Sequence, residues 1–136
     1  MKSDEELKKT FEVFVDDNNI INITALVFEK ESDDIARATE LVKESLEEIY
    51  KRSSTKTCKL LIDLSPIVSI YRNIPTKARK ACYQIAEDKH IQKAAVVTPK
   101  LIMKVLINFI TTATGKKGRF KCFFTKKEAL KWLEEK

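Results

Sequence analysis

The spacing of apolar residues changes several times along this chain, and these changes constrain the fold more than any other feature. Residues 10–15 and 20–28 are rich in β-branched and aromatic side chains and flank a polar turn at residues 16–19. This pattern predicts a β-hairpin. From Ser32, the expected N-cap, apolar residues recur at helical spacing. The recurrence predicts a long amphipathic helix that ends near Arg52, where a cation suits the helix dipole.

Three more short apolar runs follow, and helical patterns separate them. The runs cover residues 58–63, 94–97 and 119–124 and are typical of strands buried on both faces. Helices are predicted between and after them, over residues 76–87, 99–112 and from Thr125 onward. Alternation of strands and helices favours parallel strand pairs. We therefore predict one α/β domain over residues 1–136, with an ordered core of about 10–134. Its mixed sheet has about five strands, and helices pack on the sheet.

Composition excludes several classes of site. The 136 residues include only two glycines and one histidine, too few for a glycine-rich phosphate loop or for His-based metal or triad chemistry. We expect no cofactor and no metal. Three well-separated cysteines, Cys58, Cys82 and Cys122, predict reduced, buried thiols in a cytoplasmic protein. The acidic N-terminus is unlike a secretory leader, and no apolar run reaches the roughly 20 residues that cross a membrane.

Charge is unevenly distributed. Residues 1–57 carry a net charge of −5 and residues 58–136 a net charge of +11. This asymmetry favours an anionic partner for the second part, or else lysines on solvated helix faces. The basic loop at residues 114–119 contains both glycines but matches no nucleic-acid motif. We therefore do not expect nucleic acid as a partner.

A candidate binding rim follows from the expected sheet. Ligands of open α/β sheets gather at the carboxyl ends of parallel strands. The longest connection, residues 64–75, starts at one such end and carries several hydroxyl, guanidinium and amide groups. The candidate rim comprises Asp63, Ser65, Ser69, Tyr71, Arg72, Asn73, Thr76 and Thr98. The alternative is structural: Ser65 and Asn73 support turns and Thr76 caps a helix.

The helix predicted over residues 99–112 has more apolar residues than one core-facing stripe requires. Its surplus surface needs a cover, which is either another part of the domain, a second subunit or an apolar ligand. The favoured functional interpretation is self-association as a homodimer. The candidate contact residues are Met103, Leu106, Ile107 and Ile110.

The sequence does not indicate an enzyme. Nucleophilic catalysis needs a base beside the nucleophile, but His90 is expected at the opposite end of a strand from the rim, as a solvated connector residue. Asp63 ends a strand as magnesium-binding acids do in some α/β domains. It has no acidic neighbours, whereas such a cation needs several oxygen ligands.

Several segments together resemble the STAS domain (sulfate transporter and anti-sigma factor antagonist), in its SpoIIAA-like branch. The run Leu61-Ile62-Asp63-Leu64-Ser65 is similar to the family's strand and "DLS" signature. Further similarity lies in Ile70 and in the segments Pro75–Arg79, Val97–Phe109 and Phe124–Leu133. The resemblance spans residues 10–134 as a pattern. It implies a non-enzymatic regulatory domain that acts through protein–protein interaction.

The resemblance also shows where this chain departs from the family. Anti-sigma antagonists carry a phosphorylated serine in an Asp-Ser-Ser-Gly turn, where this chain has Tyr71-Arg72-Asn73-Ile74. The nearest hydroxyl is Thr76, which becomes the candidate phosphoacceptor. The same branch is compared with lipid-binding Sec14-type folds. The resemblance thus leaves an alternative function, the binding or sensing of a small apolar or anionic ligand at the rim formed by residues 64–76.

Overall fold

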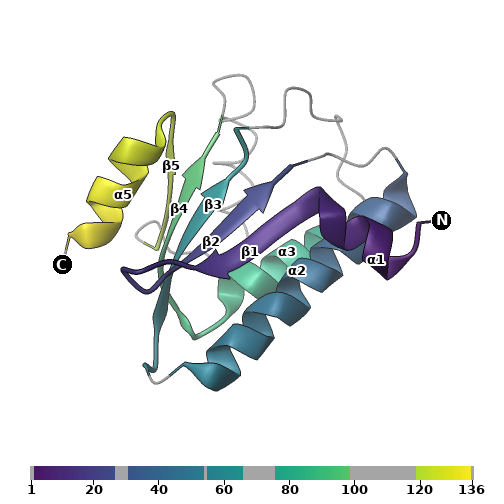
Figure 1. Cartoon of the computed structure of the whole chain (residues 1–136), viewed down its shortest axis with the longest axis horizontal. Helices are drawn as coiled ribbons and strands as arrows, with labels where there is room; N and C mark the ends of the chain where they lie inside the picture. The colour runs from purple at the N-terminus through teal and green to yellow at the C-terminus, as the bar shows by residue number, and fades with distance from the viewer. Residues whose placement is uncertain (1, 27–30, 54, 66–75, 99–118, 136) are drawn as a thin grey trace.

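Five strands form one mixed sheet in the computed structural model, which describes residues 2–26, 31–53, 55–65, 76–98 and 119–135 (Figure 1). The strands lie in chain order: β1 (Phe11–Val15), β2 (Ile20–Ala25), β3 (Cys58–Asp63), β4 (Ile91–Val97) and β5 (Phe120–Phe123). The first pair is antiparallel and the other three pairs are parallel. The predicted hairpin and the parallel second part of the sheet are thus confirmed.

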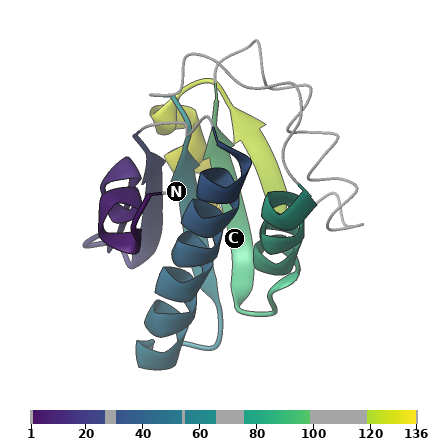
Figure 2. The ribbon, with the colours of Figure 1, turned by 90° about the vertical axis from the view of Figure 1, so that its right-hand side faces the viewer.

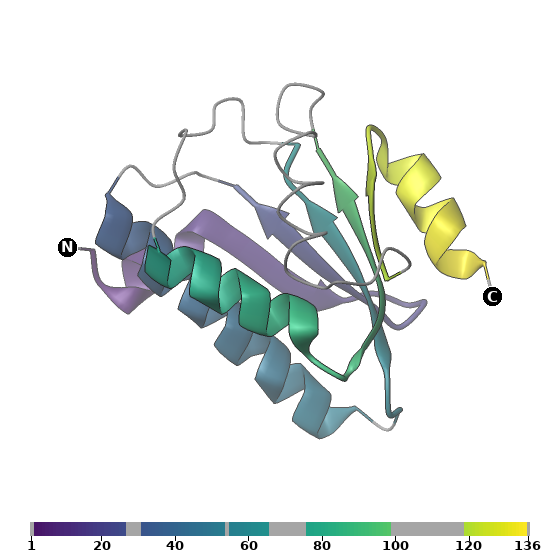
Figure 3. The ribbon, with the colours of Figure 1, turned by 180° about the vertical axis from the view of Figure 1, so that it is seen from behind.

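Helices cover both faces of the sheet. The long helix α2 (Ser32–Arg52) and α3 (Thr76–Glu87) lie side by side on one face, and α5 (Lys126–Glu134) lies on the other (Figures 2 and 3). The crossovers from β2 to β3 and from β3 to β4 contain α2 and α3, as parallel pairing requires. No helix of the described residues is long and apolar enough to cross a membrane.

Two apolar cores result, one on each face of the sheet. Strand alternation sends neighbouring side chains to opposite faces, so Leu60 packs in the core under α2 and Leu61 in the core under α5. Leu46 of α2 is buried in the first core, and Leu133 of α5 is buried in the second. The prediction that β3 is buried on both faces is confirmed by this arrangement.

Two helix starts compare differently with the sequence prediction. At α5, the Thr125 hydroxyl accepts a hydrogen bond from the Glu128 amide, so the predicted cap is confirmed. At α2, the predicted Ser32 cap is wrong. Ser32 is the first helical residue, and Glu31 stands at the N-cap in an extended conformation without a capping hydrogen bond.

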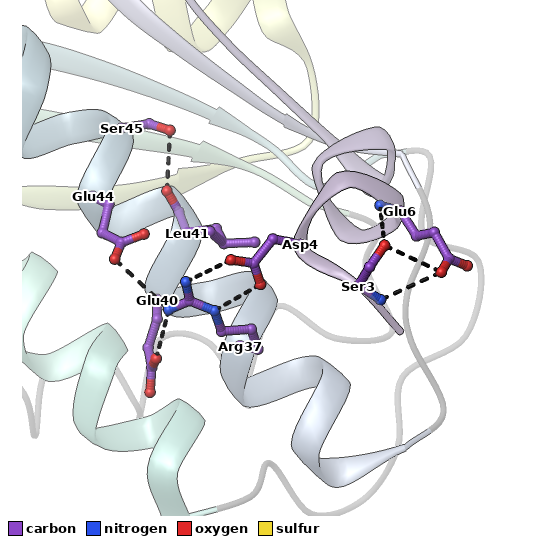
Figure 4. Close-up of polar contacts among 8 residues, drawn as sticks. All are labelled: Ser3, Asp4, Glu6, Arg37, Glu40, Leu41, Glu44 and Ser45. Atoms are coloured by element: carbon purple, nitrogen blue, oxygen red, sulfur yellow. Dashed lines mark hydrogen bonds and ion pairs between the residues drawn. The ribbon is translucent and has the colours of Figure 1, made fainter. Parts of the chain in front are cut away.

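A short N-terminal helix was not predicted. Helix α1 (Asp4–Leu7) is followed by a 3₁₀ turn, η1 (Lys8–Thr10), and begins with a complete capping box between Ser3 and Glu6 (Figure 4). Leu7 is fully buried. The packed part of the described chain therefore begins before residue 10.

Candidate functional site

The carboxyl ends of the parallel strands lie in one row, as the candidate rim requires. Thr24, Asp63 and Val97 are register partners across β2, β3 and β4. Beyond the strands, the Leu64 amide donates to the Val97 carbonyl at 2.8 Å, and the Thr98 amide donates to the Phe123 carbonyl at 3.0 Å. These bonds hold the first residues after β3 and β4 against the adjacent strands.

Asp63 and Ser65 form the best-defined polar contact of this rim. The Ser65 amide and hydroxyl both donate to Oδ1 of Asp63, at 2.9 and 2.6 Å. This is the turn role that the sequence left open for Ser65. Asp63 is half-buried and Ser65 is exposed. The contact uses only Oδ1 of Asp63 and holds the Ser65 hydroxyl at the surface, where it can accept a further hydrogen bond.

The other predicted rim residues are distributed differently. Thr98 is only 1% exposed, so its side chain lies beneath the rim surface. Thr76 is exposed at the first position of α3. No hydrogen bond between described residues joins Thr76 to Asp63 or Ser65. The remaining predicted residues lie outside the described part of the chain: Ser69, Tyr71, Arg72 and Asn73 of the rim, and Met103, Leu106, Ile107 and Ile110 of the proposed dimer helix.

A second polar cluster lies at the other end of the strands, where β3, β4 and β5 begin. His90 stacks on Tyr50 with ring centroids 4.7 Å apart, and its Nδ1 lies 2.6 Å from Oδ1 of Asp88. Nη2 of Arg119 donates to the backbone carbonyl of Asp88 at 2.8 Å. As predicted, His90 lies in the connection before β4, at the end of the strands opposite the rim. It was expected to be solvated, but its ring packs against Tyr50.

Two buried atoms of this cluster lack partners among the described residues. They are the Tyr50 hydroxyl and Nε of Arg119. Burial raises the pKa of Tyr50 above its usual value, and the negative charge of Asp88 adds to this effect. Tyr50 is therefore neutral at physiological pH. Tyr50 was not predicted as part of this cluster, although its position four residues after Leu46 places it on the apolar face of α2.

The described residues show no assembled catalytic or metal centre. No group of three or more His, Cys, Asp or Glu among them is placed to hold a metal ion. Cys58 and Cys122 are free thiols, and burial raises the pKa of Cys122. A cavity of about 300 Å³ lies between the β1–β2 turn and the end of α2, with Ile21, Ile49 and Cys58 in its lining. This cavity lies at the end of the strands opposite the rim, so it does not extend the Asp63 site.

Comparisons with known proteins agree with this architecture. The structure is similar to an uncharacterized protein of the DUF3478 family with a SpoIIAA-like fold, from Shewanella loihica PV-4. The TM-score is 0.58 at 18% sequence identity, and the match covers 90% of this chain and 91% of the other. The fold class is therefore SpoIIAA-like, as the sequence resemblance implied. The chain itself belongs to DUF7793, a domain family of unknown function, whose model matches residues 17–136. The search of curated proteins found no match.

Proposed function

We propose that this chain is a single STAS-like domain that acts without catalysis, by presenting its rim to a protein partner. The observation that carries this proposal is the Asp63–Ser65 turn at the carboxyl edge of a SpoIIAA-like sheet. Asp63 offers a carboxylate oxygen at the end of β3, and Ser65 offers an exposed hydroxyl on a turn that two hydrogen bonds to Asp63 hold in place. Such pre-ordered polar groups suit recognition because little conformational freedom is lost on binding.

The separation of polar groups favours binding over catalysis. Acid–base chemistry needs the proton donor or acceptor within hydrogen-bond reach of the reacting group. Asp63 ends β3, whereas His90 precedes the parallel strand β4, so these two residues lie at opposite ends of the strands. The nearest polar partner of His90 is Asp88, which belongs to the same edge as His90. The polar groups at the two ends of the strands are therefore separate and do not meet in one site.

The experiment compares protein capture by three forms of the full chain: wild type, Asp63→Ala and Asp17→Ala. Asp17 is an exposed carboxylate in the β1–β2 turn, at the edge opposite the rim, and serves as the matched control. We expect the same protein to be retained by wild type and Asp17→Ala, and about tenfold less of it by Asp63→Ala. Equal capture by all three forms contradicts the proposed rim.

Native mass spectrometry of the freshly purified chain tests the alternative function of the rim. A small apolar or anionic molecule that accompanies wild type and Asp17→Ala, but not Asp63→Ala, assigns the rim to ligand binding instead of partner binding. A spectrum of the bare chain in all three forms counts against a ligand and leaves partner binding as the role of the rim.

Two finer parts of the proposal concern regulation and assembly. Thr76, exposed at the start of α3, is the proposed phosphoacceptor, because a phosphate at a helix start interacts favourably with the helix dipole. Phosphopeptide analysis of the chain purified from its source tests it, and an unmodified Thr76 under all growth conditions contradicts it. The chain is also proposed to self-associate. Light scattering after size exclusion tests this, since a dimer has twice the 15.7 kDa mass of one chain.

A further inference from the structure

The outer edge of β1 presents a regular row of backbone groups that pair with no other described strand. Within the described residues, β1 lies at the end of the sheet order and pairs with β2 (Figure 1). The Asp16 amide donates to the Ile20 carbonyl and the Leu26 amide donates to the Thr10 carbonyl, so even-numbered residues of this strand face β2. The N–H and C=O groups of the odd-numbered residues therefore point away from the sheet. These residues are Phe11, Val13 and Val15.

β1 carries fewer of the features that protect an edge strand than β5 does. Edge strands are usually short, or carry lysine, proline or a bulge. β5, the other outer strand, has four residues and carries the exposed Lys121. β1 has five residues and one exposed charge, Glu12, but it has neither lysine nor proline, and its register with β2 runs without a shift. Phe14 is 48% exposed and Val15 is 44% exposed, so the edge is also apolar.

We propose that two copies of this chain pair through β1 in antiparallel orientation, centred on Val13, to form one continuous sheet across the dimer. This proposal rests on the self-association proposed above and assigns it to a surface of the described chain. Val13 then faces Val13 of the second copy, and Phe11 faces Val15 of the second copy. Each of these facing pairs exchanges two backbone hydrogen bonds.

Charge selects this register over its neighbours. A pairing centred on Glu12 places Glu12 opposite Glu12 of the second copy. A pairing centred on Phe14 places Glu12 opposite Asp16 of the second copy. Like charges directly opposite each other destabilise a strand pair. The pairing centred on Val13 places Glu12 opposite Phe14 of the second copy, which avoids both carboxylate contacts.

Side-chain packing agrees with the same register. Register partners lie on one face of a sheet, and Phe14 pairs with Asn22, on the α5 side. In the proposed dimer the two Phe14 rings are diagonal neighbours on that side, about 7–8 Å apart, within reach of aromatic side chains. On the α2 side, the exposed Val15 packs beside Phe11 of the second copy. The exposed apolar residues of β1 therefore gain apolar neighbours.

Proline at position 13 tests the hydrogen bonds of the edge. The Val13 amide points outward, so Val13→Pro removes no hydrogen bond to β2, and proline is tolerated at such edge positions. Val13→Ala loses similar packing but keeps the outward N–H, and is the matched control. By light scattering over a concentration series, we expect Val13→Pro to dimerise about thirtyfold more weakly than Val13→Ala, because two central hydrogen bonds are lost.

Two charge variants at one position test the register and do not depend on proline folding correctly. Phe14→Lys places an ammonium opposite Glu12 of the second copy, whereas Phe14→Glu places a carboxylate there. We expect Phe14→Lys to dimerise about tenfold more tightly than Phe14→Glu. Equal affinities of the two variants overturn the register.

The outcomes separate this inference from the proposed function. A wild-type chain that stays monomeric at high concentration overturns both β1 pairing and self-association, but leaves the rim to its own capture experiment. A dimer that withstands Val13→Pro and is lost in Leu106→Glu overturns β1 pairing alone. That result assigns self-association to the segment over residues 99–112.

Discussion

Arg37 of α2 holds the carboxylate of Asp4 through two parallel hydrogen bonds, from Nε to Oδ1 at 2.9 Å and from Nη2 to Oδ2 at 2.8 Å (Figure 4). Glu40 and Glu44 flank the same guanidinium from the next turns of α2. This contact ties α1 to the long helix, although α1 lies outside the segment that the family model matches. The planar guanidinium fixes the orientation of the Asp4 carboxylate through both hydrogen bonds, which the single ammonium of a lysine would not do.

Asp4→Asn is predicted to loosen α1 without unfolding the sheet. The substitution removes the charge from the bidentate contact, while Leu7 keeps its buried position as the second anchor of α1. Hydrogen exchange at the α1 amides should become about threefold faster, and exchange in β3 should not change. Glu5→Gln is the matched control on the same helix. Unchanged exchange in α1 would show that the buried Leu7 and the hydrogen bond from the Lys2 amide to Asp34 hold the helix without the Asp4 charge.

Stability is predicted to fall at acid pH, in part through Asp16. Burial raises the pKa of Asp16, but hydrogen bonds from the Ile20 amide, the Asn22 side chain and the Asn18 amide outweigh it, so the pKa lies below its usual 3.8. A lowered folded-state pKa stabilises the fold above the unfolded-state pKa and loses this contribution as pH falls through the folded value. Urea unfolding between pH 7 and pH 2.5 measures the loss.

Asp16→Ala provides the comparison for that pH series. It removes the acceptor of three hydrogen bonds and should lower the free energy of unfolding at pH 7 by about 1–2 kcal/mol. Its unfolding free energy should then depend less on pH below 4 than that of the wild type. Parallel pH curves for the two proteins would assign the acid sensitivity to other carboxylates, of which Asp4 is the first candidate, because its hydrogen bond with Arg37 also lowers its pKa.

Tyr50→Phe is predicted to leave stability unchanged or to raise it by about 1 kcal/mol. The Tyr50 hydroxyl is buried and has no hydrogen-bond partner in the described part of the chain, so its removal abolishes a desolvation penalty while the ring keeps its stack on His90. Tyr50→Leu, which also loses the stack, should be destabilising. Urea denaturation of the three proteins measures both changes. A loss above 1 kcal/mol in Tyr50→Phe would mean that an ordered water satisfies the hydroxyl.

Leu46→Ala and Leu133→Ala are each predicted to cost about 2–5 kcal/mol, because each leaves a cavity in a fully packed core. Leu46 is 1% exposed under α2, and Leu133 is 0% exposed under α5. The sheet separates the two sites, so their effects should add in the double variant. Chemical denaturation measures all three. A double variant with much less than the summed effect would show that the two cores rearrange together.

The sequence predicted β3 and the α5 cap closely because both depend on local features. An apolar run of strand length and a threonine three residues before a glutamate are visible without knowing any contact. Helix α1 was missed because four residues are too few to show helical periodicity. The Asp63–Ser65 turn was open to prediction because its two residues are close in sequence. By contrast, the partners Asp4 and Arg37 lie 33 residues apart.

The sequence by itself determined the five strands and the helices α2, α3 and α5, because the spacing of apolar residues follows directly from the backbone geometry of each element. Only the tertiary structure decided which polar atoms find partners. Asp88 and His90 share the α3–β4 connection, whereas Tyr50 comes from α2 and Arg119 directly precedes β5, so the contacts of Tyr50 and Arg119 with this connection depend on how the elements pack. The open edge of β1 is likewise a property of strand order, which local patterning does not encode.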